Sequence, residues 1–381
     1  MHSTDSEMEL VKKIDEELHQ QVKGIDILVA VAPLNYREQK NAFIASNYSS
    51  NPAFVYADHN IDLFQKKRAL YQLPVDKLAD EDLNSLYSEV IESYVDKLDQ
   101  YKSIGTSDFV YDSLRYYGEP SEKDIRNASF ILHLPDEYEI KDEKVLDANA
   151  IVEKLNTFGQ QQGYQFQIEL DNKMIANILV SGTTVKINSA ANVSETEVNA
   201  LVHHELGVHL VTTLNARSQP LNILSLGSPV NTTTQEGLAI LCEYLSGNMN
   251  FSRLKVLALR VLAVESMLKE KDFKRTFLLL KEQYKTPDDV AFAITARVYR
   301  GGGLTKDYLY IQGFHLMLNA YETRNDFENL LCGKVSIRHL PLITRLIDKN
   351  FLLKPQYVSP AVSAPQVIDS VRKFIAHAIK G

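Results

Sequence analysis

The sequence predicts an α+β protein that is mainly α, with a small sheet and a helical N-terminal part. Apolar residues recur at the three- and four-residue spacing of helices over most of the 381 residues. Alternation typical of strands is confined to residues 164–188. The composition, 45% hydrophobic and 24% charged, is that of a globular chain long enough for a large core or two domains.

The N-terminal part is predicted to be helical with one interruption. Residues 6–22 have a charged amphipathic pattern, and residues 74–101 contain at least one further helix. Residues 47–60 between them are polar with interspersed aromatic side chains, and we expect a loop and a short strand there. Residues 108–117 and 123–132 continue the helical pattern.

An acidic, proline-bearing segment at residues 134–142 is the expected boundary between a helical N-terminal region, residues 1–142, and a second domain, residues 143–381. The second domain is predicted to begin with a helix over residues 145–158. Three strands follow, the last two joined by a hairpin turn at Ser181-Gly182. Helices dominate from Ser194 onward, around a loop at Arg300–Gly303. The predicted strands are residues 164–170, 174–181 and 183–188.

Charge and composition argue against several classes of partner. The net charge is −8 and no lysine/arginine block stands out, which disfavours nucleic acid and anionic membranes as partners. No secretory signal peptide and no membrane-spanning apolar run are seen, so we expect a cytoplasmic protein. Cys242 and Cys332 lie in apolar helical segments and are expected to be buried thiols. The sequence leaves the oligomeric state open.

Residues 194–213 carry the strongest chemical signal. Ser194 and Glu197 fit a capping box that starts a helix. On that helix an apolar stripe leads to Glu205 and His209, and a buried charge must be paired or bound to a metal. The alternative for His204, Glu205 and His209 is a polar helix face with hydrogen-bonded histidines.

The spacing of the two histidines predicts an irregular helix. The usual zinc-peptidase motif places its histidines four residues apart, with a glutamate as general base. His204 and His209 are five apart, or roughly 140° on a regular α-helix, so one zinc ion could not easily accept both. We therefore predict a π-bulge, with Gly207 easing the distortion.

A third metal ligand is expected on the next helix, residues 232–246. Glu236 lies near its start, where Thr232 and Gln235 fit a second capping box. The small residue Gly237 beside it allows close approach of a neighbouring helix. Two histidines and a glutamate with an open fourth position form a catalytic zinc set. Alternatively, Glu236 is only a glutamate favoured by the helix dipole.

Two neighbouring polar residues have less certain roles. His203 falls opposite the apolar stripe, which favours a solvent-facing position or a supporting role beside the metal. Glu243 lies on the same helix face as Glu236. It could hydrogen-bond a ligand histidine, or it could be an ordinary surface charge.

The segments HHELGVH and QEGLA together resemble the bacterial family of flavohaemoglobin expression-modulating QEGLA-motif proteins, which is similar to the eukaryotic microtubule-associated tyrosine carboxypeptidases. The stretch RVYRGGGLTKDYLYIQG also resembles that family. The resemblance implies a zincin-like metallopeptidase domain with one zinc ion per chain. It implies His204, His209 and Glu236 as metal ligands and Glu205 as the catalytic glutamate.

A carboxypeptidase must also bind the terminal carboxylate of its substrate. The basic residues around the glycine loop are our candidates, because arginine binds carboxylates through two hydrogen bonds. Nearby tyrosines could form an aromatic pocket or donate to the oxyanion, and the predicted strand at residues 183–188 could pair with the substrate backbone as an edge strand. The alternatives are ion pairs with nearby aspartates and ordinary core aromatics. The substrate-binding candidates are Arg297, Arg300, Lys306, Tyr299, Tyr308 and Tyr310.

The sequence thus predicts a zinc metallopeptidase, a carboxypeptidase that removes a C-terminal aromatic or hydrophobic residue from a peptide or protein. An endopeptidase or a small-molecule amidase would use the same metal site. A regulatory or binding protein with a structural or vestigial metal site is the remaining alternative. Arg300 and Lys306 closing the far end of the cleft would favour the exopeptidase.

Overall fold

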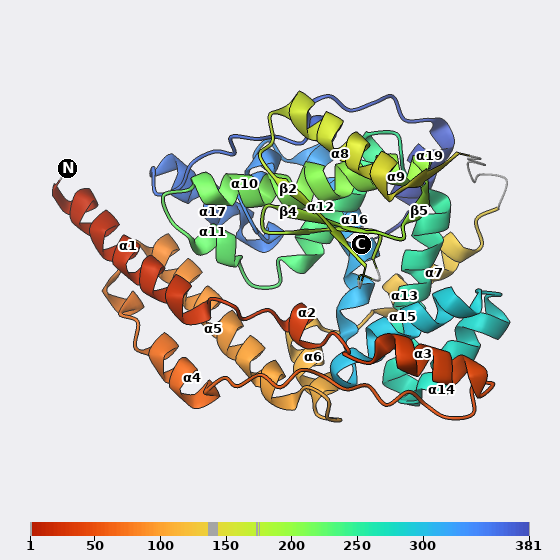
Figure 1. Cartoon of the computed structure of the whole chain (residues 1–381). Helices are drawn as coiled ribbons and strands as arrows, with labels where there is room; N and C mark the ends of the chain where they lie inside the picture. The colour runs from red at the N-terminus through yellow and green to blue at the C-terminus, as the bar shows by residue number, and fades with distance from the viewer. Residues whose placement is uncertain (1, 136–143, 173, 175, 381) are drawn as a thin grey trace.

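The structure is a computed structural model that describes residues 2–135, 144–172, 174 and 176–380. It is mainly helical with two small sheets, as the sequence predicts. Figure 1 shows the N-terminal helices along one side of a helical body that carries the strands. No helix in this described part is both long and apolar enough to cross a bilayer.

The N-terminal region contains every helix that the sequence predicts there. Local caps start several of them: Asp80 accepts from the first backbone N–H groups of α5, and Ser121 with Asp124 forms a complete capping box at α7. Two further helices, α3 and α4, were not predicted from the sequence. The elements are α1 (His2–Val22), α2 (Ile27–Ala30), α3 (Tyr36–Ala45), α4 (Leu63–Tyr71), η1 (Val75–Lys77), α5 (Glu81–Ser103), α6 (Phe109–Tyr117) and α7 (Glu122–Leu132).

The short strand expected within residues 47–60 does not form, although the whole segment is described. Side-chain hydrogen bonds take the place of a partner strand. The Asn35 side chain donates to the carbonyl of Ala53 and accepts from the N–H of Val55. The N–H of Leu34 donates to the carbonyl of Val55. The segment therefore lies as an extended loop against the start of α3.

The helix predicted from residue 145 begins later. Residues Val145–Asp147 form strand β1, which pairs antiparallel with β5 (Asn192–Ser194), and the helix is α8 (Ala148–Gln162). Asp147 ends the strand and caps the helix by accepting from the N–H of Ala150. The predicted boundary at residues 134–142 lies almost wholly outside the described residues.

The three predicted strands form one sheet of β2 (Gln167–Asp171), β3 (Ile178–Ser181) and β4 (Thr184–Asn188). The predicted β3–β4 hairpin is confirmed, with Gly182 at φ 62° in its turn. The prediction that residues 183–188 form an edge strand is wrong. The order is β2-β4-β3, because β2 pairs in parallel with β4 and covers its other side. The edge nearest the metal helix is β3.

Helices form most of the chain after β5, as predicted. They are α9 (Glu195–His204), the π-helix η3 (Glu205–Leu210), α10 (Val211–Ser218), α11 (Ile223–Leu226), α12 (Thr232–Leu245), α13 (Phe251–Glu270), α14 (Phe273–Leu278), the π-helix η4 (Leu279–Gln283), α15 (Asp288–Tyr299), η5 (Arg300–Gly302), η6 (Thr305–Tyr308), α16 (Leu309–Thr323), η7 (Phe327–Leu331), η8 (Ile337–His339), α17 (Leu340–Asp348), α18 (Pro360–Ser363) and α19 (Ser370–Ala378).

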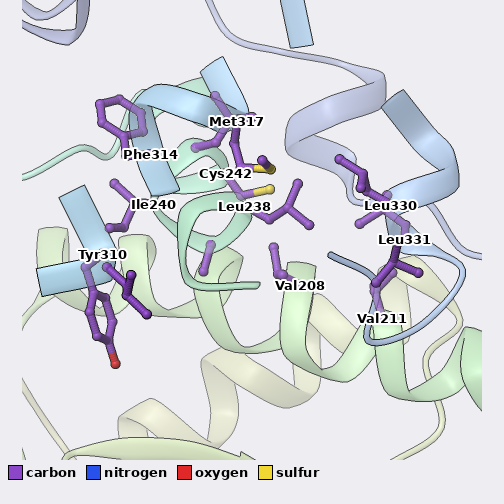
Figure 2. Close-up of a cluster of buried hydrophobic side chains, with 14 of the residues drawn as sticks. Val208, Val211, Leu238, Ile240, Cys242, Tyr310, Phe314, Met317, Leu330 and Leu331 are labelled. Atoms are coloured by element: carbon purple, nitrogen blue, oxygen red, sulfur yellow. The ribbon is translucent and has the colours of Figure 1, made fainter. Parts of the chain in front are cut away.

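Helix α12 is the centre of the packing around the site. Figure 2 shows its side chains facing Phe314 and Met317 of α16 and Val208 of η3. The close approach predicted at Gly237 is confirmed, because a Cβ there would lie 2.3 Å from the backbone of Gly313 in α16. The two backbones therefore touch through paired glycines, which fixes the depth and rotation of α12.

The N-terminal helices and the later helices share one hydrophobic core, which contains Val11, Leu86, Leu206 and Leu238 among its buried residues. Both cysteines are buried thiols, as expected. A buried carboxylate adds a polar link: Asp15 of α1 accepts from the backbone N–H groups that precede and start α11. The N-terminal region is thus packed into the same core as the helices of the site.

Candidate metal centre

The metal helix contains the predicted irregularity. Ser194 accepts from the N–H of Glu197 at 3.3 Å and starts α9. The helix then changes to π geometry over Glu205–Leu210, the interval that separates the two histidines. The prediction of a π-bulge is confirmed. Gly207 has an ordinary helical backbone within it, and its missing side chain leaves room for Ser359, whose Oγ would lie 2.9 Å from a Cβ.

His204, His209 and Glu236 come together as a cluster able to hold a metal ion, with all three ligand atoms within 4.8 Å of one another. The two Nε2 atoms lie 3.8 and 3.7 Å from Oε2 of Glu236. Ligands on a tetrahedral zinc ion lie roughly 3.4 Å apart, so small side-chain movements suffice. The His209 and Glu236 side chains are 18% and 15% exposed, which leaves a side of the site accessible.

His204 is oriented by a buried ion pair. Its Nδ1 lies 2.7 Å from Oε1 of Glu243, so its Nε2 is the nitrogen that faces the other ligands. Arg253 of α13 donates to both oxygens of Glu243, at 3.0 and 3.1 Å. Burial would raise the pKa of Glu243, but Arg253 and His204 outweigh it and lower that pKa. Of the two roles weighed for Glu243, the structure selects the hydrogen bond to the ligand histidine.

Glu236 is held on its other oxygen. Lys306 and the hydroxyl of Tyr310 donate to Oε1 of Glu236 at 3.0 and 3.1 Å, and Lys306 also contacts the Tyr310 hydroxyl at 3.0 Å. Burial would raise the pKa of Glu236, but Lys306 and the two histidines hold it well below its usual range. Glu236 is therefore a carboxylate before any metal binds, with Oε2 free for the ion.

The second predicted capping box is wrong. Helix α12 includes Thr232 as its first residue, and Asn231 precedes it without a side-chain cap. Gln235 is buried and accepts instead from the Thr212 hydroxyl at 3.1 Å. Lys334 donates to the same hydroxyl at 3.1 Å. Burial lowers the pKa of Lys334 to about 8, although Glu236 and Glu205 act to raise it. This lysine is a residue of the site that the sequence did not reveal.

Glu205 is buried next to the metal ligands but is not one of them. Its Oε2 accepts from the N–H of Val180 in β3 at 3.1 Å, which ties the edge strand to the metal helix. Burial raises the pKa of Glu205 to about 7, with His209 opposing and Glu236 adding to the shift. A carboxyl group with a pKa near neutrality can both accept and return a proton.

The six substrate-binding candidates separate in the structure. Lys306 and Tyr310 lie against Glu236, whereas Arg297 makes a bidentate ion pair with the buried Asp307, at 2.6 and 3.1 Å. The Tyr308 hydroxyl donates to the carbonyl of Tyr117. The last two of the six candidates are Tyr299 and Arg300. The Tyr299 hydroxyl lies 3.0 Å from the Thr276 hydroxyl, and the Arg300 side chain has no hydrogen-bond partner within the described residues.

His203 is neither solvent-facing nor bonded to the ligands. Its ring packs edge-on against Phe158, 5.2 Å between centroids, on the outer side of the metal helix. Burial lowers the pKa of His203 to about 4. The ring is therefore a neutral packing group in this structure. Arg253 and Lys334 are charged residues close to the cluster that no motif in the sequence marks. The partner of Lys334, Thr212, is 122 residues away along the chain.

Comparisons with known proteins found a matching family model and a similar solved structure. The family model for microtubule-associated tyrosine carboxypeptidases matches residues 41–380. A solved structure, described as a putative lipoprotein from Colwellia psychrerythraea, is 15% identical with a TM-score of 0.45, covering 82% of this chain and 72% of that one. The comparison with curated proteins found no match. With most of its length matched by the family model, the chain belongs to the microtubule-associated tyrosine carboxypeptidase family, whose fold is zincin-like.

Proposed function

We propose that this protein is a zinc-dependent carboxypeptidase that removes an aromatic or hydrophobic residue from the C-terminus of a peptide or protein. The observation that carries the proposal is the cluster of His204, His209 and Glu236 beside the unliganded Glu205. A structural metal site needs no adjacent general base, so the arrangement favours catalysis over a vestigial or regulatory site. The family match supports a carboxypeptidase. A cytoplasmic location and the bacterial QEGLA-motif grouping remain predictions.

The donor set fits zinc, since two imidazoles and one carboxylate with an open position are its common catalytic ligands. Zinc held there supplies Lewis acidity, which polarises the scissile carbonyl group and favours ionisation of the attacking water. Glu205 accepts the proton of that water and returns it to the leaving amine. Val180 holds the Glu205 carboxylate through a backbone N–H, and its strand β3 is the sheet edge nearest to the reacting atoms.

Polar groups beside Glu236 prepare the site for substrate. Tyr310 and Lys306 hold Oε1 of this ligand, and the Tyr310 hydroxyl is the candidate donor to a developing oxyanion. Tyr310 is also the remaining aromatic candidate for a side-chain pocket, because Tyr299 and Tyr308 bond to groups elsewhere in the protein.

The test is metal analysis followed by digestion of a peptide library read by mass spectrometry. We expect about one zinc ion per chain, given three protein ligands, and release of single C-terminal residues. Glu205→Gln should keep the zinc but lower turnover by roughly a thousandfold or more. Glutamine can act neither as the general base nor as a negative charge beside the metal. Glu153→Gln, an exposed glutamate on α8, is the matched control.

The same digestion separates the competing functions. Internal cleavage would indicate an endopeptidase, and hydrolysis of small amides without peptide cleavage would indicate an amidase. Wild-type turnover by the Glu205→Gln protein would refute the assigned mechanism, and zinc content unchanged by His204→Ala would refute the assigned metal site.

A further inference from the structure

Two arginines near the metal centre lack partners. Arg260 lies on α13, two turns after Arg253, and Arg300 follows the last residue of α15. In both, the Nε atom is buried and has no hydrogen-bond partner. Across the described part of the chain, neither guanidinium donates a hydrogen bond or pairs with a carboxylate; Arg260 contacts only the ring of Tyr310, 5.6 Å from its centroid. Both residues are only partly buried, but a guanidinium whose Nε is buried without a partner is costly, so each is suited to bind an anion.

The surroundings have more positive than negative charge. Arg260 and Arg300 both lie within electrostatic range of Tyr310 and of the Arg297–Asp307 ion pair. Arg297 already occupies both oxygens of Asp307. Burial and Arg297 lower the pKa of Arg260 to about 10. No further carboxylate of the described residues forms an ion pair with either unpartnered arginine.

Tyr310 connects this region to the metal. Its hydroxyl donates to Oε1 of Glu236, while its ring contacts the ammonium of Lys306 at 4.7 Å and the guanidinium of Arg260 at 5.6 Å. One aromatic side chain therefore separates the metal ligand from an unpartnered arginine. That separation suits a substrate whose scissile bond is at the metal and whose terminal carboxylate is one residue further on.

The glycine loop fixes the position of Arg300. The N–H of Gly301 donates to the Tyr56 hydroxyl at 2.8 Å, and the carbonyl of Gly301 accepts from Gly105 at 2.7 Å. A Cβ on Gly302 would lie 2.1 Å from the carbonyl oxygen of Thr106. The segment between α3 and α4 and the turn between α5 and α6 therefore hold this loop by close contacts that its glycines permit. The loop in turn presents Arg300 from a fixed backbone.

From these contacts we infer that Arg260 and Arg300 bind the terminal carboxylate of the substrate. The inference rests on the proposed carboxypeptidase function and names the residues that make the site specific for a chain end. Arg297 and Lys306 then have positioning roles, since their charges are already paired with Asp307 and Glu236. Arg260 was absent from the candidates that the sequence suggested, because it lies far from the glycine loop along the chain.

The test compares two peptides of identical sequence, one with a free C-terminal carboxylate and one with a C-terminal amide. Binding is measured by calorimetry to zinc-loaded Glu205→Gln protein, where turnover is absent. We expect the free acid to bind at least tenfold more tightly than the amide, since an arginine–carboxylate contact is worth about that much or more. In Arg260→Gln or Arg300→Gln on the same background, the acid should weaken to the level of the amide, whose affinity should stay unchanged.

Controls keep this outcome distinct from failure of the proposed function. Arg126→Gln, an exposed arginine of α7 paired only with Glu122, should leave both affinities unchanged. Arg260→Lys keeps the positive charge but not the two-pronged hydrogen bonding of arginine. It should bind the acid more tightly than Arg260→Gln does, and it replaces that variant in the test if Arg260→Gln misfolds. Equal binding of acid and amide by the parent protein, binding of neither, or unaltered acid binding in both arginine variants would overturn the inference. Wild-type protein that binds the acid selectively yet releases no residue would refute the carboxypeptidase function alone.

Discussion

At the residue scale, two of the three clustered residues that could ligate a metal are held by further polar groups. Glu243 and Arg253 orient His204, and Lys306 with Tyr310 holds Glu236. Such outer partners fix the tautomer and the charge of the ligands. The centre is therefore arranged before a metal ion enters.

Glu205 makes the stability of the metal-free protein depend on pH. Burial raises its pKa to about 7, above the ordinary value of 4.5. The folded state therefore binds this proton more tightly than the unfolded chain does. Its contribution to stability is full below pH 4.5 and is lost as the pH rises to about 7, a change on the order of 3 kcal/mol.

Glu205→Gln removes this titration while keeping an oxygen that can accept from Val180. We expect the metal-free variant to gain stability relative to wild type as the pH rises from 5 to 7.5, by up to about 3 kcal/mol. Urea unfolding in the presence of a chelator measures the difference at each pH. The same difference for Glu153→Gln should be flat. A pH-independent difference for Glu205→Gln would mean that Glu205 titrates normally in the fold.

The sequence predicted the three residues that cluster, because His204, His209 and Glu236 stand in two short motifs. It also offered Glu243 as a partner of a histidine and nearby aspartates as partners of Arg297, and both kinds of pair form. Lys306 meets Glu236 only after segments 70 residues apart pack together, so no local pattern could show this contact. Lys306 was expected to face substrate for that reason.

At the scale of elements, the spacing of the histidines was enough to predict the π-helix, because a regular helix could not bring both to one ion. The strand order was not predictable in the same way. The pairing of β2 with β4 is parallel and skips a strand, so it depends on tertiary packing and not on a turn signal. Because nothing in the sequence indicates that β2 covers the outer side of β4, β4 was expected to be the edge strand.

The limited space beside Ser359 explains the glycine at position 207 of the π-helix. Gly207→Ala would place a Cβ 2.9 Å from Oγ of Ser359, which is fully buried and in contact with the Cys242 thiol. We expect a loss of about 1–3 kcal/mol of stability from this overpacking. Urea unfolding, together with zinc content, measures it.

Ser359→Ala removes the obstructing atom and serves as the partner in a double-mutant cycle. The double variant should recover most of the stability lost by Gly207→Ala, giving a coupling energy of about 1 kcal/mol or more. Additive losses would show that glycine is required for the backbone of the π-helix and not for the space beside Ser359.

At the scale of the whole molecule, the N-terminal helices are part of the structure that supports the site. They contribute to the common core, and the segments that connect them hold the glycine loop through Tyr56, Gly105 and Thr106. The sequence predicted these helices as a separate region, since their amphipathic patterns reveal which faces are buried but not which partners cover them. Their contacts with the loop make them part of the proposed carboxylate site.

Asp15 offers the sharpest test of this shared structure. The buried carboxylate accepts hydrogen bonds from the Tyr87 hydroxyl, from the backbone and side chain of Asn222 and from the N–H of Ile223. Asp15→Ala leaves these buried donors unsatisfied, so we expect a loss on the order of 3–5 kcal/mol. Asp369→Ala removes a local cap of α19 and an exposed ion pair with Arg372, and it should cost about 1 kcal/mol.

Far-UV circular dichroism and release of bound zinc, followed through the same urea titration, show whether the two regions unfold together. We expect one coincident transition in wild type, shifted to lower urea for both probes by Asp15→Ala, because α1 and α11 belong to one core. If zinc release kept its wild-type midpoint while helical signal was lost earlier, the N-terminal helices would be an independent unit. In that case the glycine loop would be held only by its local contacts, and the carboxylate site would survive removal of α1.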